Sequence, residues 1–585
     1  MPAADLKTPW RRAALGLVLL ALFLAPRLGY LRSFVTLDEP FWLSVGANFY
    51  YALGQRELEN TVYEYHPAVT TMWFVTGSML ATFPEYRGLG QGYFDVDKNK
   101  FDPFLIEHGI SPLDLLYFAR LIQLAALAIL VLLLFFVLAG PLGDAAAFLS
   151  AGLVSAAPFF TGHSLLLNHE ALLALCVLLS IASMLVYIEG ERRLRYLVIS
   201  GAAAAVAHLT KSSAIAMVPV VMVMLLLSAW RQGKIHGLRR AIALEGRTLV
   251  LWLAATALVY IILWPGMWVA PGKMLYEVYG NAFSYAFQGA RLQVTQELQP
   301  SEFALASAWP TLRAYAGDLL GRSTPATWIG AVMALVAVAR GGRSSISLQS
   351  RRLAGFLLLT AALFILMFSL VQGRNSPHYI MTSHLAIDVA AALGWCGLLN
   401  WLMRAWASSW RPALRAGALV ILIGYQVACG LSRAPYFYTY FNPIMAGLSG
   451  RSPGYYYGEG MELAAAYLAS KPDSASTAVF AYPARGPFSY FFPGETLILN
   501  PLYLEEPGMV SMFERLTQSD FLVFYDALAQ RTANTGRFVA ALAPAEPEHV
   551  ISVQGFETIL IYEVRDLPTS FFQTLQEQPP GMRQD

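Results

Sequence analysis

Two adjacent carboxylates, Asp38 and Glu39, follow the first long apolar run of the chain. Where a chain leaves a membrane, such a pair is either the polar start of a loop or part of a catalytic centre at the membrane surface. Ionisable groups at this depth are costly to bury and are often functional. We therefore expect Asp38 and Glu39 to be catalytic residues.

Three further candidates stand close to later apolar runs. His66 precedes the apolar segment Val69 to Phe83, and His169-Glu170 begins the fourth long apolar run. A lone histidine is often a packing residue, and Glu170 could serve only as a helix cap, since a helix N-terminus favours a carboxylate. Their recurrence at one predicted membrane face favours function, with Glu170 as a second catalytic acid and His66 and His169 as substrate-binding residues.

Basic residues occur at the same predicted face. Lys211 lies in Leu209-Thr210-Lys211-Ser212-Ser213 after the fifth apolar run, whereas Arg374 and His378-Tyr379 precede the tenth. A helix N-terminus with a nearby cation and hydroxyl groups suits a phosphate. The alternative for Lys211 is an interfacial side chain that extends to water. We expect Lys211, Arg374, His378 and Tyr379 to bind substrate.

The remaining reactive residues give no firm assignment. His384 and Asp388 are four residues apart on one predicted helix face, an arrangement that is as often structural as catalytic. Carboxylates together with His66 could hold a divalent metal, but the pattern does not require one. The metal site is therefore unknown and no cofactor is certain.

Composition points to a polytopic membrane protein. The 585 residues are 56% hydrophobic and only 13% charged, whereas soluble domains carry about 25% charge. The formal charge of +2 gives no reason to expect a nucleic-acid partner. A helix needs about 20 apolar residues to cross a bilayer. By that rule we predict about eleven transmembrane helices: 13–29, 115–138, 145–160, 171–188, 196–209, 214–230, 248–264, 328–338, 353–371, 379–400 and 416–431.

Basic residues gather in alternate predicted loops, as in Arg192-Arg193-Leu194-Arg195 and Arg239-Arg240. Since cytoplasmic loops carry the excess of Lys and Arg, these loops and the N-terminus should be cytoplasmic. A further span over 69–83 would reverse that pattern, so we expect this segment to be a half-buried or re-entrant helix.

The same pattern predicts two domains. Residues 1–433 form a transmembrane module whose long loops, 32–114 and 265–325, lie outside the cell membrane. Residues 434–585 form a soluble extracytoplasmic α/β domain. In this tail, short β-branched or aromatic runs at 477–482, 496–499, 521–525 and 558–564 predict strands, and 459–470 has a helical period.

Several short motifs resemble the membrane-embedded glycosyltransferases of the protein O-mannosyltransferase and aminoarabinose transferase type, which have the GT-C fold. The motifs are Asp38-Glu39, Tyr65-His66-Pro67-Ala68, Tyr117-Phe118-Ala119-Arg120, Asn168-His169-Glu170, Leu209-Thr210-Lys211, Ser376-Pro377-His378-Tyr379, Tyr440-Phe441-Asn442-Pro443 and Gly458-Glu459-Gly460.

The resemblance implies a polyprenyl-phosphate-sugar donor and an inverting transfer to a protein, lipid or glycan acceptor at the outer face of the cytoplasmic membrane. Asp38 occupies the place of the family's candidate base, and Glu170 matches its second acidic position. Lys211 and Arg374 would then stabilise the departing phosphate. Two other readings share the apolar runs: a transporter or flippase for a lipid-linked sugar, and a non-catalytic envelope assembly protein.

Overall fold

The computed structural model describes residues 7–63, 66–96, 100–282, 305–343, 346–370, 376–405, 409–450, 457–498, 514–525 and 539–576. It divides into two compact units. The helical unit comprises Met1–Gly29, Val45–Tyr93 and Phe118–Ser452, and the mixed unit comprises Tyr30–Ser44, Phe94–Tyr117 and Pro453–Asp585.

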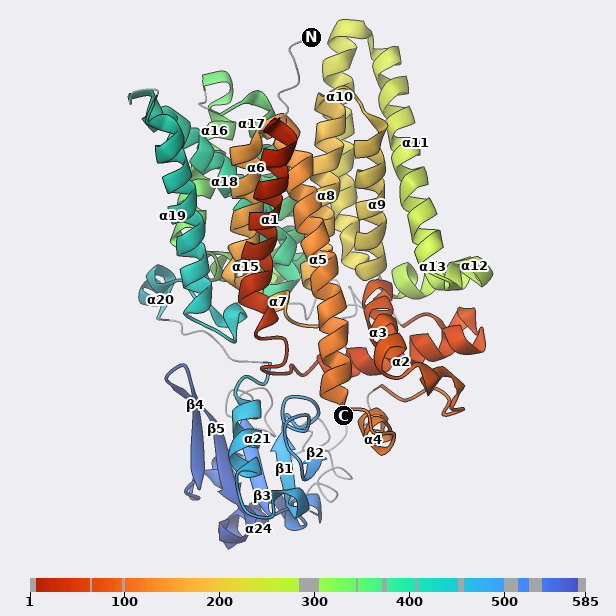
Figure 1. Cartoon of the computed structure of the whole chain (residues 1–585), viewed down its shortest axis with the longest axis vertical. Helices are drawn as coiled ribbons and strands as arrows, with labels where there is room; N and C mark the ends of the chain where they lie inside the picture. The colour runs from red at the N-terminus through yellow and green to blue at the C-terminus, as the bar shows by residue number, and fades with distance from the viewer. Residues whose placement is uncertain are drawn as a thin grey trace. The chain divides into compact units, whose positions relative to one another are not determined.

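Long apolar helices build the helical unit (Figure 1). Two helices, α2 (Glu39–Gln55) and α5 (Pro112–Leu142), begin in the mixed unit and continue into this one. The other helices here are α1 (Lys7–Leu28), α3 (Val69–Thr82), α6 (Asp144–Ala156), α7 (Pro158–His163), α8 (Glu170–Glu189), α9 (Leu194–Thr210), α10 (Met217–His236), α11 (Leu238–Leu263), α12 (Gly266–Val269), α13 (Pro271–Leu275), α15 (Leu305–Arg322), α16 (Pro325–Ala339), α17 (Leu348–Leu370), α18 (Met381–Leu402), α19 (Arg411–Leu431) and α20 (Pro443–Ser449).

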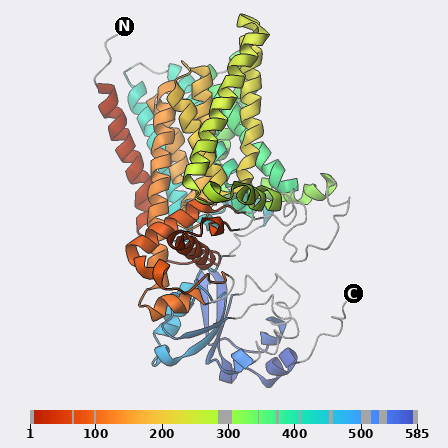
Figure 2. The ribbon, with the colours of Figure 1, turned by 90° about the vertical axis from the view of Figure 1, so that its right-hand side faces the viewer.

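Each of the eleven predicted spans falls on one or two of these helices. Within the described residues, seven helices are long and apolar enough to cross a membrane, or eight if the bent pair α15 and α16 counts as one span. The multi-pass helical membrane fold is therefore confirmed, while the number of eleven spans stays a prediction. α10 and α11 run side by side over most of their length (Figure 2).

Small residues let neighbouring helices approach closely. A Cβ atom on Gly394 of α18 would lie 2.0 Å from the carbonyl oxygen of Gly330 on α16. Only glycine fits such a crossing, and close backbone approach is a common way to pack helices in membranes. α18 thereby takes a central place, since it also packs against α17, α6 and α8.

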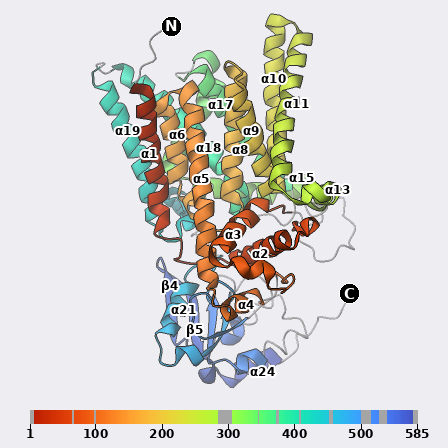
Figure 3. The ribbon, with the colours of Figure 1, turned by 45° about the vertical axis from the view of Figure 1, so that its right-hand side comes forward.

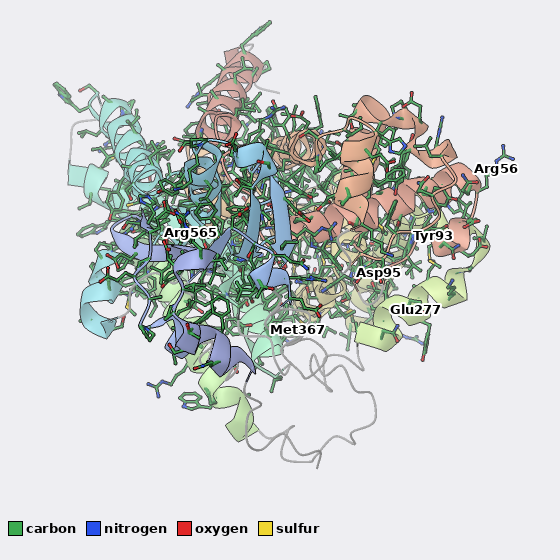
Figure 4. The ribbon with its side chains drawn as sticks, turned by 90° about the horizontal axis from the view of Figure 1, so that it is seen from below. Arg56, Tyr93, Asp95, Glu277, Met367 and Arg565 are labelled. Carbon is green, nitrogen blue, oxygen red and sulfur yellow. The ribbon has the colours of Figure 1, made fainter. Side chains whose placement is uncertain are left out.

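The helix predicted at 69–83 is present as α3. Its 14 residues are too few to cross a bilayer, and most of its side chains are buried. α3 packs beside α2 (Figure 3), where a Cβ on Gly46 would lie 2.4 Å from Val75 Cβ. α2 ends just before Arg56, which has a φ of 62° and points away from the ribbon (Figure 4).

The mixed unit is built on a five-stranded sheet in the order β2-β1-β3-β5-β4. β1 (Ala478–Tyr482) pairs in parallel with β2 (Glu495–Ile498) and β3 (Phe521–Tyr525), and β5 (Phe556–Glu563) pairs antiparallel with β3 and β4 (His549–Val553). The helices are α4 (Phe101–Glu107), α21 (Met461–Ala469) and α24 (Thr569–Gln576).

The predicted α/β character of the tail is confirmed. Four of the five strands were predicted within a few residues, whereas β4 was missed. The division of the structure groups first-loop residues 30–44 and 94–117 with residues 453–585. The simpler predicted boundary between 433 and 434 stays a prediction.

Candidate active site

Three helix ends of the helical unit carry the predicted polar residues. Glu170 is the first residue of α8, and Lys211 follows α9 directly. His378 and Tyr379 lie in the short 3-10 helix Pro377–Ile380, just before α18. Helix ends bring these groups together because each apolar run stops where its chain meets polar surroundings.

Glu170 and Lys211 form a buried ion pair between Lys211 Nζ and Glu170 Oε1. Each side chain is only 6% exposed. The backbone N–H of Glu170 donates to Asn168 Oδ1 at 3.2 Å, a local turn that leads into α8. A buried charge without its partner is strongly unfavourable, so each group depends on the other in this apolar setting.

Aromatic and imidazole rings surround this pair. Lys211 Nζ lies 4.5 Å from the centroid of the Tyr379 ring, a cation–π contact. His169 Nδ1 is 2.8 Å from Thr71 Oγ1 on α3, and the His66 ring lies 6.0 Å from the His169 ring. The structure thus gathers His66, His169, Glu170, Lys211 and Tyr379 around one place.

Burial, and next the positive charge of Lys211, lower the pKa of His169 to about 3. A neutral imidazole can donate through one ring nitrogen and accept through the other. His169 is therefore suited to hold a polar group in place rather than to supply positive charge.

His378 extends the cluster toward residues that the sequence reasoning did not select. Its ring lies 4.3 Å from the Tyr379 ring and 5.9 Å from the His163 ring. His163 Nδ1 is in turn 3.2 Å from Asn168 Nδ2. His163 lies only six residues before His169. This proximity of two histidines was the sequence signal that could have identified His163.

Arg322 is the second residue that was missed. It ends α15 at the 115° bend before α16 and is 8% exposed. Its Nη1 donates to the Tyr438 carbonyl at 2.6 Å, and its guanidinium lies 5.1 Å from the Phe159 ring centroid. Among the described residues no carboxylate pairs with it. A buried cation of this kind could balance the charge of an anionic ligand.

Arg374, the other predicted basic residue, lies outside the described residues. The pair His384 and Asp388 is buried within α18, but each contacts a different hydroxyl group. His384 Nδ1 is 3.4 Å from Ser323 Oγ, and Asp388 Oδ1 accepts from Thr327 Oγ1 at 2.8 Å.

Asp38 and Glu39 belong to the mixed unit. Asp38 is exposed, whereas Glu39 is 1% exposed. Glu39 Oε2 accepts from the backbone N–H of Thr36 at 2.8 Å and from Thr36 Oγ1 at 2.9 Å. This carboxylate closes the turn from Thr36 to Glu39 that precedes α2, which leaves Asp38 as the acid of the pair that faces solvent.

Within the part of the chain that the structure describes, no three His, Cys, Asp or Glu side chains are grouped so that they could hold a metal ion. The sequence analysis left a metal site open, and the described residues do not provide a set of ligands for one.

Comparison with known proteins adds a family match. Residues 116–260 match the model of the family described as dolichyl-phosphate-mannose-protein mannosyltransferase. No curated protein sequence matches the chain. The matched segment contains His169, Glu170 and Lys211, so the buried ion pair lies inside it.

Three solved structures are similar at low identity. ArnT from Cupriavidus metallidurans, bound to undecaprenyl phosphate, shares 14% identity over 95% of this chain and 98% of its own, with a TM-score of 0.44. The oligosaccharyltransferase AglB from Archaeoglobus fulgidus, in complex with an inhibitory peptide and a dolichol-phosphate, shares 12% over 92% and 71%, with a TM-score of 0.47. The S. cerevisiae Pmt1-Pmt2 protein O-mannosyltransferase complex shares 17% over 51% and 38%, with a TM-score of 0.35.

The family match covers the segment that holds the ion pair and three of the motifs on which the resemblance rested. Over residues 116–260 the chain carries the sequence pattern of a membrane glycosyltransferase family, and the expected resemblance to the protein O-mannosyltransferase type is confirmed.

Proposed function

We propose that the chain is an inverting glycosyltransferase that moves a sugar from a polyprenyl-phosphate-sugar to a protein, lipid or glycan at the outer face of the cytoplasmic membrane. The observation that carries this proposal is the buried Glu170–Lys211 pair inside the family-matched segment. The transporter alternative is not favoured, because the matching family is one of transferases.

The reaction assigns one role to Asp38. Its carboxylate takes the proton of an acceptor hydroxyl as the hydroxyl oxygen attacks the anomeric carbon of the sugar. The bond from that carbon to the phosphate oxygen breaks, and polyprenyl phosphate leaves with the electron pair. One displacement inverts the anomeric centre. Asp38 suits this role because its side chain is exposed and a positioned base typically contributes about 10²- to 10⁴-fold.

Lys211 has the complementary role at the leaving group. Negative charge develops on the phosphate oxygen as the bond breaks, and a fixed cation in a dry site stabilises it strongly. The ion pair with Glu170 holds Lys211 in place before the donor arrives. We propose that Arg322 and Arg374 also balance the negative charge of the phosphate. The residues that bind the donor are His66, His169, His378 and Tyr379.

Asp38→Asn tests the function directly. The purified protein in detergent is given polyprenyl-phosphate-mannose with a radiolabelled sugar, together with envelope protein, lipid and glycan fractions as acceptors. We expect the wild type to transfer label without any membrane gradient and Asp38→Asn to be slower by about 10²- to 10⁴-fold. Glu107→Gln, which changes another exposed acid, should retain full turnover.

Undiminished transfer by Asp38→Asn would remove Asp38 as the base. Absence of transfer by the wild type to every fraction, tested with several sugars on the donor, would contradict the proposed function itself.

A further inference from the structure

We infer that Arg485 is a positioning residue, which fixes the turn that carries Asp38 by binding that turn and the first-loop segment Phe94–Tyr117 (the insertion) together. The inference rests on the proposed role of Asp38. All the residues concerned belong to the mixed unit.

Arg485 donates to two stretches of chain that lie far from it and from each other in sequence. Nε and Nη2 contact the two carboxylate oxygens of Asp102 at 2.8 and 3.2 Å, and Nη1 donates to the Val96 carbonyl at 2.9 Å. Nη2 also donates to Ser44 Oγ at 2.7 Å and to the Pro40 carbonyl at 3.3 Å. One guanidinium therefore joins the tail, the insertion and the first turns of α2.

The ion pair at the centre of this cluster is buried, since the Arg485 side chain is 14% exposed and that of Asp102 is 6% exposed. Tyr490 adds a second donor to Asp102, with its hydroxyl 3.2 Å from Oδ1. Burial, and next the charge of Asp102, raise the pKa of Tyr490, so its hydroxyl stays protonated and donates. Two-pronged contacts between arginine and a carboxylate fix orientation as well as distance.

The residue after Arg485 touches the same turn through its backbone. Gly486 has a φ of +88°, and a Cβ there would lie 2.3 Å from Pro40 Cγ and 3.1 Å from Val35 Cγ1. Only glycine combines this backbone conformation with so close an approach. The tail loop after β1 thus presses on both ends of the turn from Val35 to Pro40.

Asp38 stands in the middle of that turn and is exposed. A hydrogen bond between Thr36 and Glu39 closes the turn. Arg485 and Gly486 of the tail pack against it from outside. A catalytic side chain is placed by the residues that hold its backbone, so the accuracy of Asp38 depends on this supporting shell. A displacement of about 1 Å can cost about 10²-fold in rate.

The insertion now has a physical role. Asp102 is buried on α4, and the Phe94 ring packs against Phe101 and Phe104 of the same helix at 5.7 and 5.1 Å. α4 therefore presents the carboxylate that holds Arg485. Without it, a buried guanidinium would be left without its anion, which is costly.

A spin label at position 38 tests the positioning without any assay of activity. In full-length protein whose three native cysteines are replaced by alanine, Asp38→Cys is labelled and its electron paramagnetic resonance spectrum is recorded. Adding Arg485→Ala or Gly486→Ala should make the label markedly more mobile. Adding Lys471→Ala, which breaks the surface pair of Lys471 with Glu548 on the tail, should leave the spectrum unchanged.

Activity provides the second arm. With Asp38 intact, we expect Arg485→Ala to lower kcat by about 10- to 100-fold while the KM for the donor changes little. The exchange Asp102→Arg with Arg485→Asp should recover part of kcat. An unchanged label mobility in Arg485→Ala and Gly486→Ala would overturn the inference whatever the activity shows, whereas full activity of Asp38→Asn would remove only the proposed role of Asp38 as the base.

Discussion

Glu170 and Lys211 can each contribute to the site only while the other is present. Water hardly reaches either side chain, so removing one charge leaves the other buried and unpaired. Such losses typically cost about 3–5 kcal/mol, whereas removing both charges together is often tolerated. Stability and activity should therefore respond differently to single and double substitutions at this pair.

We expect Glu170→Gln and Lys211→Met each to lower the free energy of unfolding by about 3–5 kcal/mol, and the double variant to recover most of that loss. Activity should stay low in all three, because the cation that faces the leaving group or its partner is missing. Denaturation in detergent and transfer of labelled sugar give the two readouts. A double variant that is both stable and fully active would show that the pair is only structural.

The contribution of His169 to the stability of the protein depends on pH. Burial lowers its folded pKa to about 3, while the unfolded chain titrates at about 6.5. Since the unfolded state binds the proton first, the contribution of His169 to stability is complete above pH 6.5 and is lost as pH falls toward 3. At pH 5 this loss amounts to about 2 kcal/mol.

The prediction concerns the slope of stability against pH. His169→Gln should lose less stability than the wild type between pH 7 and 5, by about 2 kcal/mol. Thr71→Val, which removes the hydroxyl partner of His169 but keeps the titrating ring, should retain the wild-type slope. Melting midpoints across this range measure both, and equal slopes for wild type and His169→Gln would refute the assignment.

At the scale of elements, α3 connects the first loop to the ion pair. It carries Thr71, which contacts His169, and it packs against α2 where Gly46 meets Val75. Gly46→Ala should push α3 away from α2 and cost about 1–3 kcal/mol through overpacking. Because Thr71 would move with α3, kcat should fall as well.

The repair variant makes this prediction specific. Val75→Ala added to Gly46→Ala returns the lost space and should recover both stability and kcat. Gly88→Ala, where a Cβ meets nothing within 4 Å, serves as the neutral control. Failure of the double variant to improve on Gly46→Ala would show that contact with Val75 is not the cause.

The helices and their polar ends could be predicted because both leave local signals. An apolar run of about 20 residues identifies a helix, and the ends of such runs hold Glu170, Lys211 and Tyr379. β4 also had a signal that was overlooked, since Gln554 and Gly555, both with positive φ, form a two-residue turn into β5.

Long-range contacts leave no such signal. Arg485 and Asp102 are separated by 383 positions, and neither belongs to a periodic pattern that indicates its partner. Arg322 was missed for a similar reason, because its burial depends on the bend between α15 and α16 rather than on its neighbours in sequence. Such contacts follow from the packing of elements, which single-residue patterns do not encode.

At the scale of the whole molecule, the basic residues offer a test of orientation. Arg231 of α10 and Arg352 of α17 both pair with Glu189 at the end of α8. These three helix ends therefore lie on one side of the helical unit. Positive charge concentrated on one side is typical of the cytoplasmic face, so the predicted loops at α10–α11 and before α17 should share that face.

Single cysteines, introduced into the protein whose three native cysteines are replaced by alanine, should show which side of the membrane is cytoplasmic. Arg239→Cys is placed in the first turn of α11, and Glu557→Cys on β5 of the tail; both positions are exposed. In intact spheroplasts a membrane-impermeant maleimide should label Glu557→Cys and spare Arg239→Cys, because the tail is predicted outside and the basic loop inside. In inverted vesicles the pattern should reverse. If Arg239→Cys is labelled in spheroplasts, the polyprenyl donor would meet the Glu170–Lys211 pair from the cytoplasmic face, and the proposed outer-face transfer would be wrong even if Asp38 is the base.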